Sequence, residues 1–123
     1  MLEATGITLH YGGSQILHGV SLAAAPGQVT CVMGNNGVGK TSLMNLLAGR
    51  HPRSGGDLRL MGDRLGRVTA QEMARRGVGY VPQGRAIFPM LTVRENLETG
   101  FGCLPRGQRK VPDAIYDSFP VLA

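Results

Sequence analysis

Alternating hydrophobic and polar positions predict strands at the start of the chain. Within residues 2–11, and again within residues 15–24, apolar side chains recur at about every second position. The turn-forming run Gly12-Gly13-Ser14 separates the two stretches,. A period of two is typical of strands with one buried face, so the pattern predicts an antiparallel pair. Pro26-Gly27 then breaks the chain.

A mainly apolar run at residues 29–33 predicts a different kind of strand, one that is buried on both faces of a parallel sheet,. In that setting we expect Cys31 to be a small buried thiol. Residues 77–81 predict another sheet strand, which Pro82 stops,.

Helices are predicted from apolar spacing and from capping signals. Leu43, Leu46 and Leu47 lie at i, i+3 and i+4, and Gly49 supplies a stop,. Capping-box spacing predicts two more helices. These are expected from Thr69 to Arg76 and from Thr92 toward Phe101, with a strand at 57–61, loops at 51–56 and 102–112, and one or two helical turns at 113–119.

This order of elements predicts an α/β fold, with an antiparallel β lobe first and the start of a parallel-sheet core behind it. With 123 residues, 42% of them hydrophobic, the chain is long enough for one domain but not for two,. We divide it into an antiparallel lobe (1–28), a core (29–101) and the start of a helical region (102–123).

The composition argues against two classes of function, membrane spanning and nucleic-acid binding. The chain lacks a run of about eighteen apolar residues, so no segment is expected to span a membrane,. The net charge of +5 comes mostly from arginines scattered between Arg50 and Arg109, and aromatic residues are few. This scatter argues against a nucleic-acid surface.

One motif carries specific chemistry. It is the run Gly34-Asn35-Asn36-Gly37-Val38-Gly39-Lys40-Thr41, which satisfies G-x-x-x-x-G-K-[ST] between a predicted strand and a predicted helix,.

The residue types of this motif suit a nucleoside triphosphate with Mg²⁺. Its glycines let backbone amides approach an anion, and the helix N-terminus favours negative charge. Lys40 offers an ammonium group to the phosphates, and the Thr41 hydroxyl can join the shell of Mg²⁺. We expect residues 34–41 and the following Ser42 to bind ATP, with Thr41 also a metal ligand.

Flanking segments point to a family. Tyr11-Gly12 stands before the loop, and Tyr80-Val81-Pro82-Gln83 follows it. With the loop, they resemble the ATP-binding subunit of ABC transporters along essentially the whole chain. The resemblance implies that Tyr11 stacks on adenine, that Ile16 packs beside the base, and that Gln83, in the Q-loop, senses the γ-phosphate and the metal.

One branch of the family is especially similar. The stretch from Gly84 to Leu97 resembles the branched-chain amino acid and urea uptake systems, and residues 11–17 and 37–41 lean toward the urea members. The resemblance implies a protein that lies peripherally on the cytoplasmic face of the inner membrane. Its partners would be permease subunits and a second ATP-binding subunit, with no nucleic acid expected.

The family's remaining motifs are not found in these 123 residues. They are an LSGGQ-type signature, an apolar strand ending in Asp-Glu, and a switch histidine, all placed after the Q-loop. We therefore assign no catalytic residue here and expect near-background ATPase activity from this chain alone. Two alternatives stay open: a nucleotide-binding module without turnover, and a DNA-acting ABC ATPase, which the short path from Thr41 to Gln83 disfavours.

Overall fold

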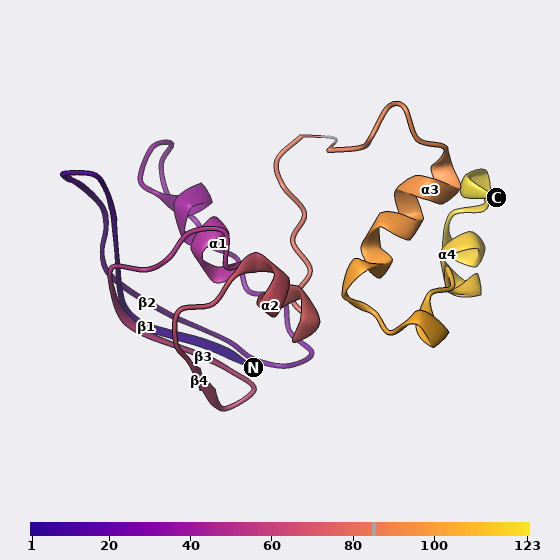
Figure 1. The fold of residues 1–123 in the computed structure, drawn as a ribbon. Coiled ribbons are helices and arrows are strands. Elements are labelled where there is room, and N and C mark those ends of the chain that lie inside the picture. The colour runs from indigo at the N-terminus through magenta and orange to yellow at the C-terminus, as the bar shows by residue number, and fades with distance from the viewer. Residues whose placement is uncertain (85) are drawn as a thin grey trace. The chain divides into compact units, whose positions relative to one another are not determined.

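The structure is a computed structural model that describes every residue of the chain except Arg85. The chain forms two compact units, residues 1–78 and residues 79–123. The first contains a sheet and two helices, and the second contains short helices alone (Figure 1).

The sheet of the first unit has four strands in the order β2-β1-β3-β4, and every neighbouring pair is antiparallel. They span Leu2–Tyr11 (β1), Ser14–Ala24 (β2), Gly55–Leu60 (β3) and Asp63–Leu65 (β4). In register, Leu9 of β1 faces Leu17 of β2, and Ala4 faces Leu58 of β3. The predicted antiparallel pairing of the first two strands is thus confirmed, and β1 lies between β2 and β3.

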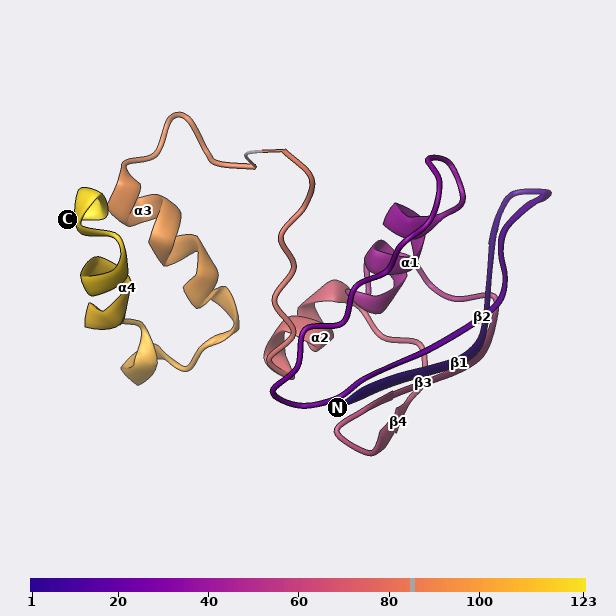
Figure 2. The ribbon, with the colours of Figure 1, turned by 180° about the vertical axis from the view of Figure 1, so that it is seen from behind.

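Two helices cover one face of this sheet. They are α1 (Lys40–Leu47) and α2 (Ala70–Arg75), and both views place them on the same side of the strands (Figures 1 and 2). The predicted leucine face of α1 is buried as expected. The core cluster consists of Ala4, Ile7, Leu9, Leu17, Leu43, Leu46, Leu47, Leu58, Leu65 and Met73.

Two predicted strands are wrong, those at residues 29–33 and 77–81. Neither segment is a strand in the structure, and Val29 and Met33 are 92% and 89% exposed. A strand needs hydrogen-bonding neighbours, and in the described part of the chain no strand pairs with either segment,. Cys31 is exposed as well, so the expectation that its thiol is buried is wrong.

A hairpin that we did not predict follows β3. The chain turns at Met61 and Gly62, although Met61 was expected to belong to the strand, and it returns as β4. Arg64 on β4 donates from Nε to the Asp57 carboxylate on β3 at 2.8 Å. This exposed pair spans neighbouring strands, so it supports the hairpin without contributing to the core,.

The second unit is built from short helical segments. The predicted helix from Thr92 is α3 (Val93–Glu98), which continues as a 3-10 turn, η1 (Thr99–Cys103). The expected loop contains η2 (Arg106–Gln108). The last predicted helix is α4 (Asp113–Ser118), which is followed by η3 (Pro120–Leu122).

Across the described residues, the structure contains no helix that is both long and apolar enough to cross a membrane.

Gly49 fixes how closely α1 approaches α2. It ends α1 with a φ of 72°, and its amide donates to the carbonyl of Leu46 at 2.9 Å. A Cβ built on Gly49 would lie 2.7 Å from the carbonyl oxygen of Thr69 and 2.9 Å from Cγ of Met73. Both the backbone conformation and the space therefore require glycine.

We expect Gly49→Ala to lower the free energy of unfolding by about 1–3 kcal/mol, because the new methyl group clashes with backbone and strains a left-handed residue. Urea denaturation measures the change. Gly66→Ala is the control, since an added Cβ there meets nothing within 4 Å. Equal stability of the two variants would contradict this account of the α1–α2 contact.

Both predicted capping boxes are present. The backbone amide of Thr69 donates to the Glu72 carboxylate at 2.7 Å, and that of Thr92 donates to Glu95 at 2.8 Å. These bonds, followed by those from the two hydroxyl groups, lower the pKa of each glutamate below its ordinary value of 4.5,. The contribution of each cap to stability is thus present above pH 4.5 and is lost as the pH falls through the folded-state pKa.

The two boxes act as controls for each other. Thr69→Ala should raise the pKa of Glu72 part of the way to 4.5, because the hydroxyl bond is lost while the backbone amide remains. The pKa of Glu95 should not move, and Thr92→Ala should give the reverse pattern. Side-chain carboxyl titrations by NMR measure both values. If Thr69→Ala left the pKa of Glu72 unchanged, that result would contradict the assigned cause.

Candidate functional site

The phosphate-loop motif lies directly before α1, where Gly39 is the N-cap residue with a φ of 97°. A Cβ on Gly39 would lie 2.9 Å from Cδ2 of Leu17 and 3.3 Å from the carbonyl oxygen of Ile16. The end of the loop therefore lies directly against β2, with no room for a side chain. This contact fixes the start of α1 relative to the sheet.

Lys40 folds back over the loop. Its Nζ donates to the carbonyl oxygens of Gly34 at 2.7 Å and Asn35 at 2.5 Å. The ammonium group therefore lies across the mouth of the loop and draws its first residues toward the helix. Because the loop residues 34–38 are exposed, an anion can approach this charge from solvent,.

The N-terminus of α1 is the one helix start in residues 1–78 that lacks a side-chain cap. No side chain accepts from its first amides, and no acidic residue stands in its first turn. By contrast, α2 has a full capping box at Thr69. Since the first amides of a helix need an acceptor, α1 presents donors and a positive dipole end to solvent at the motif.

This arrangement fits the triphosphate of a nucleotide. The donors are backbone amides and the Lys40 ammonium, and the exposed Thr41 can present its hydroxyl to a metal ion held by the phosphates,. Among the described residues, no group of three or more His, Cys, Asp or Glu side chains could hold a metal ion by itself. Thr41 and Gln83 stay the predicted protein ligands of Mg²⁺, with phosphate oxygens and waters completing its shell.

Tyr11 lies at the end of β1, beside the β1–β2 turn, and its side chain is 39% exposed. Its ring contacts that of His51, with centroids 4.8 Å apart and planes inclined at 61°. His51 belongs to the segment that leaves α1. The aromatic residue expected to stack on adenine therefore touches the segment that follows α1.

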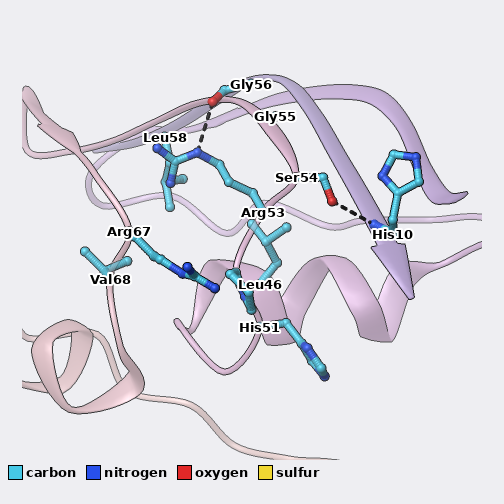
Figure 3. Close-up of a pocket in the computed structure, with 11 residues that line it drawn as sticks. His10, Leu46, His51, Arg53, Ser54, Gly55, Gly56, Leu58, Arg67 and Val68 are labelled. Carbon is cyan, nitrogen blue, oxygen red and sulfur yellow. Dashed lines mark hydrogen bonds between the residues drawn. The ribbon is translucent and has the colours of Figure 1, made fainter. Parts of the chain in front are cut away.

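A separate pocket of about 560 Å³ lies between β1, β3 and the end of α1 (Figure 3). None of its lining residues belongs to the phosphate loop. The Arg53 guanidinium is bound to three carbonyl oxygens, those of Gly56, Leu65 and Gly66, at 2.6–2.9 Å. Its charge therefore holds the surrounding backbone together rather than facing a ligand.

The predicted site residues fall into three groups. Residues 34–42 and Ile16 are brought together by the contact between Gly39 and β2. Tyr11 lies beside the turn of the β1–β2 hairpin and contacts His51. Gln83 is exposed in the second unit, where its role stays a prediction. Arg85, in the stretch that resembles the branched-chain amino acid and urea uptake systems, lies outside the described residues.

Sequence reasoning missed Asn96. Its side chain accepts from the amide of Phe88 at 2.8 Å and donates to the carbonyl oxygens of Phe88, Leu91 and Thr92 at 3.0–3.1 Å. It therefore holds residues 88–92 as a closed loop. The signal was weak, since an asparagine four residues after a helix cap has no motif of its own.

Comparison with known proteins decides the family. The sequence model described as "ABC transporter" matches residues 17–119, which is most of the chain. The chain belongs to the ABC transporter family. The relatives reported below are named as ATP-binding proteins of import or transport systems. The 123 residues thus belong to the ATP-binding domain of an ABC protein. The geometry of the loop at residues 34–41 agrees with this.

Two curated relatives illustrate the range of transport proteins to which the chain is similar. An Fe(3+) ions import ATP-binding protein of Rhodococcus jostii is 42% identical over 108 residues, covering 88% of this chain and 30% of the relative. A high-affinity branched-chain amino acid transport ATP-binding protein of Pseudomonas aeruginosa is 32% identical over 123 residues, covering 99% of this chain and 53% of the relative. The chain thus spans 30% to 53% of the length of these two relatives.

Solved ABC structures confirm the predicted fold class. A nucleotide-free ATP-binding cassette from an ABC transporter superposes with a TM-score of 0.74 at 24% identity, over 98% of this chain and 46% of that one. A dimeric ATP-binding cassette bound to ADP and Pi gives 0.73 at 22% identity, over 89% and 50%. At these identities the likeness concerns the fold alone.

Proposed function

We propose that this chain is the nucleotide-holding part of an ATP-binding subunit that drives solute import through an ABC transporter. The observation that carries the proposal is the geometry at Gly39 and Lys40. The loop lies tightly against β2, the amides of α1 lack a side-chain cap, and an ammonium group lies across the loop. Together these features place several donors where a triphosphate can accept them.

Within this site each residue has a distinct task. The amides of residues 34–41 and the Lys40 ammonium hold the phosphates, and Thr41 joins the metal shell. The first compact unit gives Tyr11 an open ring for adenine, with Ile16 beside the loop. Gln83 would report the γ-phosphate to the rest of the transporter. Mg²⁺, when bound, supplies charge neutralisation between the phosphates.

The proposed setting is a transporter in which two ATP-binding subunits meet permease subunits at the cytoplasmic face of the membrane. The relative from Pseudomonas aeruginosa, matched over 99% of this chain, supports an amino-acid solute. We propose branched-chain amino acids or urea, the latter resting on the resemblance of residues 11–17 and 37–41. The division into a lobe (1–28), a core (29–101) and a helical region (102–123) belongs to the same proposal.

The loop is tested by removing its charge. In the full-length protein, Lys40→Ala should weaken MgATP binding about 10- to 100-fold, as expected for losing charge-assisted hydrogen bonds of about 1.5–3 kcal/mol. Isothermal titration calorimetry measures the affinity. Lys110→Ala is the matched control, since Lys110 is exposed and paired only with Asp113 in the described chain. Equal affinities for the two variants would overturn the proposal.

The loop held by Asn96 supports the proposed contact with a permease. Phe88 and Met90 in this closed loop are 55% and 93% exposed, and the preceding Ile87 is 64% exposed, so apolar side chains face solvent here. Apolar patches in a fixed shape are typical of protein contacts. The loop follows Gln83 in sequence, so the proposed sensor and the proposed contact share one segment.

We expect Asn96→Ala to reduce ATP-driven uptake at least about threefold while leaving MgATP affinity within about twofold, because it frees the loop but spares the phosphate site. Uptake of labelled branched-chain amino acids or urea by cells carrying the variant measures the first effect. Gln108→Ala removes an exposed amide from the same unit as a control. A parallel loss of ATP affinity would contradict the assignment.

A further inference from the structure

We propose that His51 is a positioning residue for adenine, because it holds the Tyr11 ring in the orientation in which the base stacks on it. The inference rests on the proposed function, in which Tyr11 receives the base. The observation behind it is the contact between the two rings, with centroids 4.8 Å apart and planes inclined at 61°. An inclined contact of this kind is a favoured geometry for two aromatic rings.

The backbone around His51 is tied down at both ends. On one side, Gly49 ends α1 against the backbone of Thr69, and the amide of Arg50 donates to the carbonyl of Asn45 at 2.9 Å. On the other, the following residue is Pro52, which restricts the conformation of His51 itself,. The imidazole therefore starts from a backbone with little freedom.

The far end of this segment is attached beside Tyr11. The amide of Ser54 donates to the carbonyl of Thr8 at 2.8 Å, and the Ser54 hydroxyl accepts from the amide of His10 at 3.0 Å, a bond drawn in Figure 3. Both partners lie on β1, within three residues of Tyr11. Residues 49–54 thus connect the end of the phosphate-binding helix to the strand that carries the aromatic ring.

Tyr11 needs such support, because its position is otherwise permissive. It stands at the last residue of β1, next to two glycines, and its side chain is 39% exposed. A ring that is free to rotate loses conformational entropy when a base stacks on it. The contact with His51 restrains the ring before the base arrives and leaves part of the ring open to the base.

The test compares a ligand that contains the base with one that contains only phosphates. In the full-length protein, His51→Ala should weaken ATP binding about two- to tenfold, the range expected for one aromatic contact. Binding of inorganic tripolyphosphate, which has no base, should stay unchanged. His51→Phe keeps an aromatic ring and should restore most of the ATP affinity. His18→Ala removes an exposed imidazole from β2 and serves as the matched control.

A double-mutant comparison adds a second readout. In a Tyr11→Ala background, His51→Ala should have no further effect on ATP affinity, because the ring it positions is gone. Additive losses would overturn the proposal, as would an equal loss for ATP and tripolyphosphate, or unchanged ATP affinity in His51→Ala.

If His51→Ala fails to fold, His51→Phe and His51→Gln carry the same comparison, with and without an aromatic ring. Equal ATP affinity of these two variants would then overturn the proposal. Failure of the proposed function looks different. In that case the unmodified protein binds neither ATP nor tripolyphosphate, or Lys40→Ala leaves the ATP affinity unchanged.

Discussion

The packing of α1 on the sheet is the constraint on which the rest of the structure depends. Leu43, Leu46 and Leu47 bury their side chains against β1 and β2, and Gly39 brings the helix start against Leu17 without space for a Cβ. Burial of three leucines contributes about 4–9 kcal/mol of transfer free energy as an upper estimate. The phosphate loop takes its position from this packing, because it is the segment that leads into the anchored helix.

Anchoring also explains why the site sits at an uncapped helix. A helix start normally gains from a Thr or Asp cap, as α2 does with Thr69,. At α1 the cap position is Gly39, which the close contact with β2 requires, so the first amides have no side-chain acceptor. The packing of the leucine face compensates for the missing cap. The missing cap lowers the local stability of α1, but it leaves the first backbone amides available as donors to an anion.

The sequence predicted those parts of the fold that local patterns determine. The β1–β2 alternation, the leucine spacing of α1 and the two capping boxes depend on neighbours within a few residues, and all are present. The strands expected at 29–33 and 77–81 depend on distant partners and did not form. The site divides in the same way: the motif at 34–41 is a local signal, whereas the Tyr11–His51 contact joins residues forty positions apart.

The central claim is that one rigid arrangement of β1, β2 and α1 receives both ends of ATP. A crystal structure of the full-length protein with Mg²⁺ and a non-hydrolysable ATP analogue tests it most directly. The account predicts the triphosphate within residues 34–41, with Lys40 Nζ turned from the carbonyl oxygens of Gly34 and Asn35 to phosphate oxygens, and adenine on the Tyr11 ring. A nucleotide bound elsewhere, or adenine away from Tyr11 with the phosphates in the loop, would contradict it.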